Sequence, residues 1–378
     1  MLRVMTVLGT RPEIIRLSRV IPLLDKHTHH ILVHTSQNYD PQLNEVFFKE
    51  MKIRPPDHYM QPDKSSLAGM IADIFKESEM LMRDYKPEAV LILGDTNSAL
   101  SAIIAKRMRI PVYHMEAGNR SWDQNVPEEI NRKIVDHISD FNLPYTEHAR
   151  RNLIAEGIPP RRIILSGSPM YEVLNHYEED ISKSDILNKL QIERKDYFIV
   201  SAHREENVDH PGRLNKLVDT LHSIAKTFQR PIIISTHPRT KNRLQHLGIS
   251  IENELIRFLP PFGFFDYIFL QQNALCAVSD SGTISEEAAI LNFPAITIRN
   301  SMERPEALDA GSITLSGLEP EMVVAALREA IEEYSLGVRK RLPIEYFIPD
   351  TSYRVLRLIL GTARLSHKWS GIDMPGQF

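Results

Sequence analysis

The stretch that decides the fold is "ALCAVSDSGTISEEAAILNFPAITIR", residues 274–299. Its first and last apolar runs are short and unbroken, which is typical of strands in a parallel sheet covered on both faces. Between them lie a Ser-Gly-Thr turn, at 281–283, and a helix-forming segment. Strand, turn, helix and strand in this order predict a βαβ unit. The backbone N–H groups at the start of such a helix can hold a phosphate group.

The same alternation of apolar runs and amphipathic segments continues in both directions from this stretch. The polar segment 171–196 carries no strand signal and separates two series of runs. The first series is 3–9, 30–35, 89–95, 111–118, 141–145 and 162–167, and the second is 197–203, 231–236, 255–260, 274–280, 294–299 and 312–317. We therefore predict an α/β protein with two doubly wound, Rossmann-like domains, at residues 1–170 and 171–349. If the two sheets face each other, their strand-end loops surround one cleft.

The last segment, residues 350–378, begins with an amphipathic helix over 350–365 that follows Pro349. We expect this helix to cross back onto the first domain. The alternative is that it caps the second domain.

Composition limits the kinds of partner and compartment. The net charge of −4 gives no basic field for nucleic acid or for a membrane surface. The single cysteine, Cys276, excludes an internal disulfide and fits a reducing compartment. No apolar run approaches the roughly 18 residues that would span a bilayer. We expect a cytoplasmic protein that binds neither nucleic acid nor membrane, and the His and Asp spacings do not predict a zinc site.

The Ser-Gly-Thr turn is the best phosphate-binding candidate, because neither the dinucleotide fingerprint nor the P-loop pattern occurs in the chain. The hydroxyls of Ser281 and Thr283 would assist the backbone amides and the helix dipole. Glu287, about one turn into the helix, could accept hydrogen bonds from both hydroxyls of a ribose. Glu286 and Glu287 could instead simply complement the helix N-terminus, which we favour for one of the two. The cationic candidates are Arg11, Arg204 and Arg304.

Seven motifs together resemble one family, the non-hydrolysing UDP-N-acetylglucosamine 2-epimerases, which have the glycosyltransferase-B fold. The resemblance covers nearly the whole chain, and its order and spacing are specific although each motif alone is weak. The motifs are "GTRPE" (9–13), "GDTNSAL" (94–100), "HMEAGNR" (114–120), "VPEEINR" (126–132), "SAHREEN" (201–207), "SDSGTISEEA" (279–288) and "ERPEALDAG" (303–311).

The resemblance implies roles for individual residues of this chain. Four match the catalytic positions of the family: Asp95, Glu116, Glu128 and His203. Five match positions that hold UDP: Arg11, Ser281, Gly282, Glu287 and Arg304. Thr283 stands where the family usually has glycine, and Arg16 stands where it usually has lysine, which keeps the charge but changes the geometry.

The chemistry of the family requires such groups. Loss of UDP from C1 of the sugar makes the C2 proton labile, and the resulting 2-acetamidoglycal takes UDP back with the proton delivered to the opposite face. This needs an acid or base on each face of C2 and a cationic clamp on UDP. It needs no metal or redox cofactor.

The motif variants point to one branch of the family. "SQNYDPQLNEVFF" (36–48), the residues Glu205-Glu206-Asn207, "PPFGFFDY" (260–267) and "PIEYFIPDTSYRV" (343–355) look like the branch that converts UDP-2-acetamido-2,6-dideoxy-L-talose to UDP-N-acetyl-L-fucosamine for capsule or O-antigen synthesis. The alternative is interconversion of UDP-N-acetylglucosamine and UDP-N-acetylmannosamine.

Two readings from other functional classes also stay open. A retaining glycosyltransferase would share the fold and the UDP site, and a non-catalytic sensor of sugar nucleotides would keep only the UDP site. The acids at 95, 116 and 128 speak against both. The family resemblance also implies a homodimer.

Overall fold

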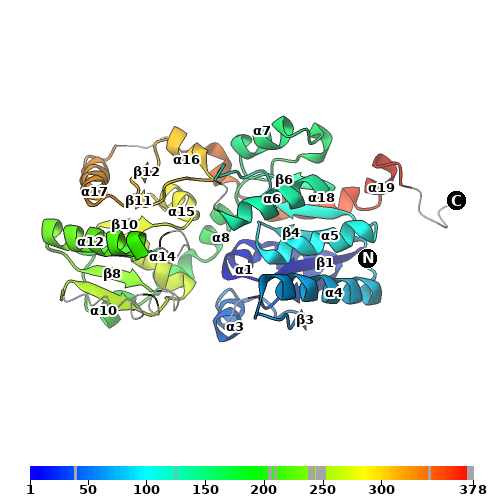
Figure 1. Cartoon of the computed structure of the whole chain (residues 1–378), viewed down its shortest axis with the longest axis horizontal. Helices are drawn as coiled ribbons and strands as arrows, with labels where there is room; N and C mark the ends of the chain where they lie inside the picture. Colours follow the sequence, from blue (N-terminus) through cyan, green and yellow to red (C-terminus); the bar gives the residue numbers. More distant parts are fainter. Residues whose placement is uncertain are drawn as a thin grey trace. The chain divides into compact units, whose positions relative to one another are not determined.

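The computed structural model describes residues 1–37, 41–123, 126–202, 207, 211–236, 243, 253–338 and 342–372. It divides the chain into two compact units (Figure 1). Unit 1 is Met1–Leu174 together with the chain from Phe347 onward, and unit 2 is Asn175–Tyr346. No helix in the described ranges is long and apolar enough to cross a membrane.

Unit 1 is built on a parallel sheet of six strands in the order β3-β2-β1-β4-β5-β6. Every side chain of the central strand β4 is buried, as is every side chain of β1 except the first, because helices cover both faces of the sheet. The strands are β1 (Arg3–Leu8), β2 (His29–His34), β3 (His58–Tyr59), β4 (Ala89–Leu93), β5 (Val112–Met115) and β6 (Phe141–Leu143).

The helices of unit 1 follow the predicted alternation. They are α1 (Arg11–Leu17), α2 (Val20–His27), α3 (Pro41–Glu50), α4 (Leu67–Tyr85), η1 (Asn97–Leu100), α5 (Ser101–Arg107), α6 (Pro127–Ile138), α7 (Glu147–Ala155), η2 (Pro160–Arg162) and α8 (Met170–His176), whose last two residues belong to unit 2. Two more, α18 (Thr351–Thr362) and α19 (Ser366–Trp369), come from the end of the chain. Helix α18 packs on α2, and the hydroxyls of Thr362 and Tyr113 lie 2.7 Å apart.

Unit 2 repeats the same topology. Its six parallel strands are in the order β12-β11-β10-β7-β8-β9. The strands are β7 (Phe198–Ser201), β8 (Ile232–Ser235), β9 (Ile256–Leu259), β10 (Cys276–Ser279), β11 (Ala295–Thr297) and β12 (Thr314–Leu315). The helices are α9 (Glu178–Ser182), α10 (Ile186–Leu190), α12 (Pro211–Phe228), α14 (Phe264–Asn273), α15 (Ile284–Leu291), α16 (Pro305–Asp309), α17 (Pro320–Ser335) and η3 (Ile344–Phe347).

The two doubly wound sheets confirm the fold class predicted from the sequence, and one predicted strand is wrong. The run 162–167 forms no strand, and only an isolated bridge joins Ile163 to Asn142. The run still lies beside β6, because the backbone N–H groups of Ile164 and Ser166 donate to the main-chain oxygens of Asn142 and Pro144 over 2.9 and 3.0 Å. The short strand β3 was not predicted, since its two residues are too few to show a pattern.

Both sheets reverse their strand order at one point, and in such folds ligands bind there. In unit 1 the reversal lies between β1 and β4, and in unit 2 it lies between β7 and β10. The loops that follow these strands therefore place the candidate site residues.

Candidate active site

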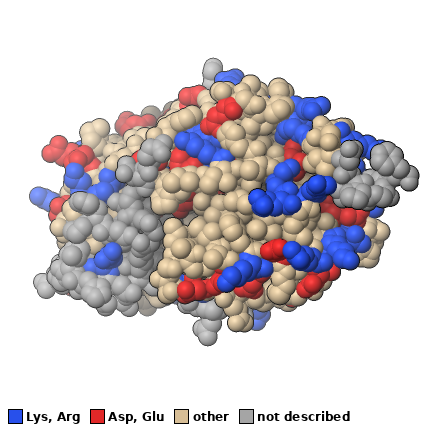
Figure 2. Space-filling model, turned by 45° about the vertical axis from the view of Figure 1, so that its right-hand side comes forward, with Lys and Arg blue, Asp and Glu red and all other residues tan. Residues whose placement is uncertain are grey.

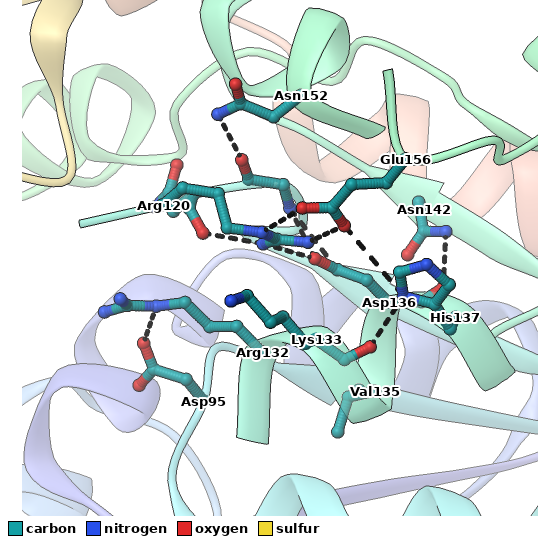
Figure 3. Close-up of polar contacts among 12 residues, drawn as sticks. Asp95, Arg120, Arg132, Lys133, Val135, Asp136, His137, Asn142, Asn152 and Glu156 are labelled. Atoms are coloured by element: carbon teal, nitrogen blue, oxygen red, sulfur yellow. Dashed lines mark hydrogen bonds and ion pairs between the residues drawn. The ribbon is translucent and has the colours of Figure 1, made fainter. Parts of the chain in front are cut away.

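Asp95 follows β4 at the reversal point of unit 1, and a buried arginine holds it. Arg132 Nε donates a hydrogen bond of 2.6 Å to Asp95 Oδ2 (Figure 3), and Asn131 donates to the main-chain oxygen of Asp95. The Asp95 side chain is 21% exposed, so one side of the carboxylate still meets solvent. Both of its partners lie on α6, which fixes the carboxylate against a rigid element.

Arg132 holds a second acid besides Asp95. Its Nη1 donates to Glu129 Oε2 over 3.0 Å, and Glu129 is almost fully buried. The same oxygen accepts from the backbone N–H and the hydroxyl of Ser121. The first turn of α6 also carries Glu128, which is half-buried. Helix α6 therefore carries the predicted acid Glu128 and supports the predicted acid Asp95 through Arg132. The supporting pair of Arg132 and Glu129 was not among the predicted site residues.

Glu116 follows β5, the strand beside β4 in the sheet. Its φ angle is 65°, a left-handed conformation that costs energy for a residue other than glycine and is common at functional sites. The Nη1 of Arg16, a buried side chain, donates to Glu116 Oε2. Arg16 was predicted to bind substrate, and the structure pairs it with a predicted catalytic acid.

Glu13 is a buried acid that joins the loop after β1 to the loop after β4. Its carboxylate accepts hydrogen bonds from the backbone of Gly9 and Thr10, at 2.5 and 2.7 Å, and from the hydroxyls of Thr96 and Ser98, at 2.8 and 2.7 Å. Burial raises the pKa of Glu13, and these hydrogen bonds offset only part of that rise. The pattern Thr-x-x-Glu at 10–13 is a capping-box signal that could have predicted this arrangement.

Two neighbouring side chains complete this edge of unit 1. Gln37, at the start of the divergent loop after β2, donates from Nε2 to the Thr96 hydroxyl over 2.9 Å. Arg11 is exposed in the first turn of α1, and its guanidinium lies 5.3 Å from the ring centroid of Phe47. Arg11 therefore lies at the reversal point of unit 1, and its contact with a diphosphate stays a prediction.

A buried polar network fixes the turn that carries Glu116. Arg120 donates to Asp136 over 2.8 Å and to both carboxylate oxygens of Glu156 (Figure 3). His114 Nδ1 also lies 2.9 Å from Asp136. Although burial raises the pKa of Asp136, the hydrogen bond and charge of His114 and the charge of Arg120 lower it below the ordinary value. Asp136 also accepts from the backbone of Gly118, which closes the turn after Glu116.

In unit 2, the Ser-Gly-Thr turn opens α15 as predicted. Thr283 is the N-cap residue, and its hydroxyl lies 3.0 Å from that of Ser281. The backbone N–H groups of Ser281 and Thr283 donate to the hydroxyls of Ser279 and Ser281 over 3.0 and 3.3 Å. Gly282 stands between them with no side chain to cover the backbone. Glu287, one turn further, is buried and accepts a 2.9 Å hydrogen bond from Gln271.

Arg304, a predicted UDP ligand, is buried against an acid. Its Nη1 forms an ion pair with Glu286, which is fully buried in α15. Both acids of α15 thus have a partner outside their own helix, Arg304 for Glu286 and Gln271 for Glu287. Nearby, the hydroxyl of Tyr346 donates to Glu306 over 2.8 Å, and burial raises the pKa of Glu306 although the charge of Arg304 opposes the rise.

Two of the predicted residues, His203 and Arg204, lie outside the described residues. Asn207, from the same motif, is described and buried, and it donates to Asp280 over 3.0 Å. Within the described ranges, no group of three or more His, Cys, Asp or Glu side chains is arranged to hold a metal ion.

Comparisons with known proteins define the class. The family model for UDP-N-acetylglucosamine 2-epimerase matches residues 23–360. The UDP-N-acetylglucosamine 2-epimerase of Methanocaldococcus jannaschii is 36% identical over 85% of this chain and 90% of its own length. The UDP-2,3-diacetamido-2,3-dideoxy-D-glucuronate 2-epimerase of Pseudomonas aeruginosa is 31% identical over 87% of this chain and 92% of its own.

Solved structures agree with the fold. A UDP-N-acetylglucosamine 2-epimerase from Rickettsia bellii is 48% identical, with a TM-score of 0.91 and coverage of 97% of this chain and 98% of that one. The M. jannaschii enzyme in complex with UDP-GlcNAc and UDP is 32% identical, with a TM-score of 0.89 over 95% of this chain and all of that one. The fold is of the glycosyltransferase-B type. The chain belongs to the UDP-N-acetylglucosamine 2-epimerase family, and it is an isomerase, a UDP-sugar 2-epimerase.

Proposed function

We propose that this chain inverts C2 of a UDP-N-acetylhexosamine by elimination and re-addition of UDP through a 2-acetamidoglycal. The observation that carries the proposal is the pair of acids at neighbouring strand ends of unit 1. Asp95 and Glu116 are each held by a different arginine, Arg132 and Arg16. Each carboxylate is thus fixed in orientation while part of it stays exposed. Fixed carboxylates at two points are what proton transfer on two faces of one carbon requires.

The reaction has two steps, elimination of UDP and its re-addition to the glycal. The C1–O bond to UDP breaks, positive character develops at C1, and one carboxylate removes the C2 proton to leave the glycal. UDP then returns to C1 while a second acid delivers a proton to the opposite face of C2. Asp95, Glu116 and Glu128 are the groups of unit 1 that we assign to these transfers, and His203 is assigned to the oxygen that links the sugar to the diphosphate.

Unit 2 supplies the UDP site in this proposal. The turn at 281–283 holds the diphosphate, as helix N-termini commonly do, and the Ser281 and Thr283 amides exchange their hydroxyl partners for phosphate oxygens when UDP binds. Glu287 accepts from the ribose hydroxyls. Arg11, Arg16, Arg204 and Arg304 provide positive charge that faces the UDP, and Arg16 and Arg304 also pair with Glu116 and Glu286.

We propose that the substrate is UDP-2-acetamido-2,6-dideoxy-L-talose and that the product is UDP-N-acetyl-L-fucosamine. Support comes from the divergent motifs at 36–48 and 205–207 and from the segments 260–267 and 343–355. The P. aeruginosa relative, whose name gives a diacetamido-glucuronate, supports the view that members of this family differ in their sugar. The second candidate is UDP-N-acetylglucosamine/UDP-N-acetylmannosamine interconversion, which the names of the M. jannaschii and R. bellii proteins favour.

One experiment tests both levels. The protein is incubated in heavy water with each UDP-sugar and no acceptor, and the products are followed by NMR. Epimerisation with deuterium at C2 of both pools is expected, with efficient, hyperbolic turnover of the L-sugar and poor turnover of UDP-N-acetylglucosamine. Retention of the C2 hydrogen would contradict the elimination route. Efficient, sigmoidal turnover of UDP-N-acetylglucosamine alone would leave the second candidate, and no epimerisation of either sugar would favour a glycosyltransferase or a sensor.

Two further parts of the proposal come from the sequence alone. We assign the protein to the cytoplasm, on the argument from its single cysteine, and we propose a homodimer. Sedimentation equilibrium of the purified chain tests the second point, and a monomer mass of 43.4 kDa at all concentrations would contradict it.

A further inference from the structure

We propose that unit 1 carries a second ligand site, for a small phosphorylated molecule with an apolar body, at the edge of the sheet opposite the acids. A pocket of about 450 Å³ lies there, which is within the range of small-molecule sites. It is lined where β1, β4 and β5 begin, by Arg3, Glu88 and Pro111 among others. Asp95 and Glu116 follow the opposite ends of β4 and β5. The pocket is therefore distinct from the proposed substrate site.

The charge of this pocket is opposite to that of the protein. Its lining includes five permanent cations and one acid, which gives a net charge of 5 − 1 = +4 with His367 neutral. The whole chain carries −4. The cations are Arg3, Arg83, Lys86, Arg109 and Arg364, and the acid is Glu88. Figure 2 brings the right-hand side of Figure 1 forward and shows several lysine and arginine side chains there, with acidic side chains between them. Such a concentration of one sign in a concave surface attracts anions.

Contacts between distant segments hold the rim in place. Arg3 Nε donates to the main-chain oxygen of Lys86 over 2.8 Å, and Arg364 donates from Nε and Nη2 to Glu88 over 3.1 and 3.0 Å. His367 Nε2 lies 2.5 Å from the main-chain oxygen of Arg109. The N-terminus, the end of α4, the end of α5 and the C-terminal helices thus meet at one pocket. Arg364 pairs with Glu88, the one acid of the lining, and Arg83 pairs with Glu79 over 2.6 Å just outside it.

The floor of the pocket is apolar, which determines the class of ligand. It is formed by Met82, Pro87, Met108, Ile110, Pro111 and Ala363. Guanidinium groups match the geometry of phosphate oxygens and bind them by charge-assisted hydrogen bonds. A purely inorganic anion would contact the cations of the pocket but not its apolar residues. A phosphorylated molecule with a flat or aliphatic body would contact both the cations and the apolar residues. A sugar nucleotide or another phosphorylated metabolite has this combination.

Two methionines of the floor allow a direct test. The full-length protein is labelled with ¹³C at the methionine methyl groups, and the signals of Met82 and Met108 are assigned with Met82→Leu and Met108→Leu. UDP and pyrophosphate are the probes, titrated separately at low salt. We expect saturable shifts of both signals with each probe, tighter binding of UDP than of pyrophosphate, and weaker binding of both as salt is added.

The variant Lys86→Glu/Arg364→Glu should weaken the binding measured at Met82 and Met108 at least about tenfold, because it replaces two cations of the rim by acids. Arg107→Glu is the matched control, since Arg107 is an exposed arginine outside the pocket lining, and it should leave the binding unchanged. The absence of saturable shifts at millimolar probe, or equal binding in the double variant, would overturn the proposal.

A membrane contact is the competing explanation for a basic surface with apolar residues. The same variants are therefore tested for binding to phosphatidylglycerol vesicles. If the double variant loses vesicle binding while neither UDP nor pyrophosphate shifts Met82 and Met108 in the unmodified protein, the surface is a lipid contact and the proposed ligand site is wrong.

Discussion

The two sheets of this protein have the same strand order but opposite chemistry at their reversal points. In unit 1 the strand ends carry acids that arginines hold: Asp95 with Arg132, and Glu116 with Arg16. In unit 2 an acid holds the arginine, since Glu286 pairs with Arg304, and the strand end carries hydroxyls and a glycine. The same topology thus presents fixed carboxylates from one unit and fixed hydrogen-bond donors from the other.

The difference shows that the fold sets the place of a site and the side chains set its chemistry. In unit 1, helix α6 supports the loop after β4 through Asn131 and Arg132. In unit 2, the turn after β10 is supported by its own hydroxyls and by Asn207, which bonds Asp280. We therefore expect changes in unit 1 to affect turnover and changes in unit 2 to affect UDP affinity.

The largest expected effect is on turnover when a unit 1 acid becomes an amide. Asp95→Asn or Glu128→Gln should lower kcat by about 10²–10⁴-fold while UDP still binds, because proton transfer by a positioned acid contributes that factor. Epimerisation followed by NMR and UDP affinity measured by calorimetry separate the two quantities. Asp84→Asn makes the same replacement at an exposed position of α4 and should leave both unchanged. Normal turnover of the acid variants would show that the catalytic groups lie elsewhere.

The second effect concerns the arginine behind Asp95. Arg132→Met removes the 3.0 Å ion pair of the buried Glu129 and leaves only the half-exposed Lys133 at 4.0 Å, so it should cost about 3 kcal/mol of stability, as the loss of one partner from a buried ion pair commonly does. Turnover should fall as well, because Asp95 loses its orientation. Both tryptophans, Trp122 and Trp369, lie in unit 1, so denaturant unfolding followed by their fluorescence reports this unit.

Lys133→Met provides the matched control for this variant. Lys133 is on the same helix, with Nζ 4.0 Å from Glu129 and a side chain that is 38% exposed. Its loss should change stability by less than about 0.5 kcal/mol, as for most exposed ion pairs. If the two variants were equally stable, the contact between Arg132 and the two acids would have no energetic role.

The third effect belongs to unit 2 and to binding. Ser281→Ala combined with Glu287→Ala should weaken UDP binding about 10–100-fold, because hydrogen bonds to charged phosphate and to ribose are lost. Ser335→Ala with Glu329→Ala changes the same residue types on α17 of unit 2 and should leave affinity intact. Calorimetric titration with UDP measures both. An unchanged affinity in the first variant would remove the turn from the UDP site.

Most of the fold could be predicted from the sequence, because parallel strands buried on both faces leave continuous apolar runs. Eleven of the twelve predicted runs contain a strand, and the exception at 162–167 lies beside β6 without forming one. The positions of Asp95, Glu116 and the turn at 281–283 could also be predicted, since each lies at the end of such a run. Where His203 and Arg204 lie stays a prediction.

The pairing of these groups could not be predicted. Arg132 meets Asp95 across 37 positions, and Arg16 meets Glu116 across 100. No local pattern records such contacts, which form only when the strands assemble. The pairings of Arg16 with Glu116 and of Arg304 with Glu286 are therefore absent from the sequence pattern, and the binding of substrate by both arginines stays a prediction. Glu13 is the exception, because its capping box is local and its pattern can be read.

The smallest expected effect is a pH dependence of stability that unit 1 has through His34 and that the corresponding strand of unit 2 lacks. Strand β2 of unit 1 ends at His34, whereas the corresponding strand β8 of unit 2 ends at Ser235, which does not titrate. Burial, assisted by the charge of Lys64, lowers the pKa of His34 from 6.5 to about 4. The backbone N–H of Ser36 donates to His34 Nδ1 over 3.1 Å, so protonation of this nitrogen would break a hydrogen bond. The folded state therefore favours neutral His34.

The sign of the effect on stability follows from this lowered pKa. The unfolded chain takes up the proton near pH 6.5 and the folded chain only near pH 4, so the contribution of His34 is present above 6.5 and is lost as the pH falls toward 4. Between about pH 7.5 and about pH 5.5, unit 1 should lose about 1 kcal/mol from this residue. Tryptophan-detected unfolding should show that loss in the parent chain and not in His34→Gln. The exposed His27→Gln should behave as the parent. The same slope in all three chains would mean that His34 is protonated equally in the folded and unfolded states, and this contrast between the units would not exist.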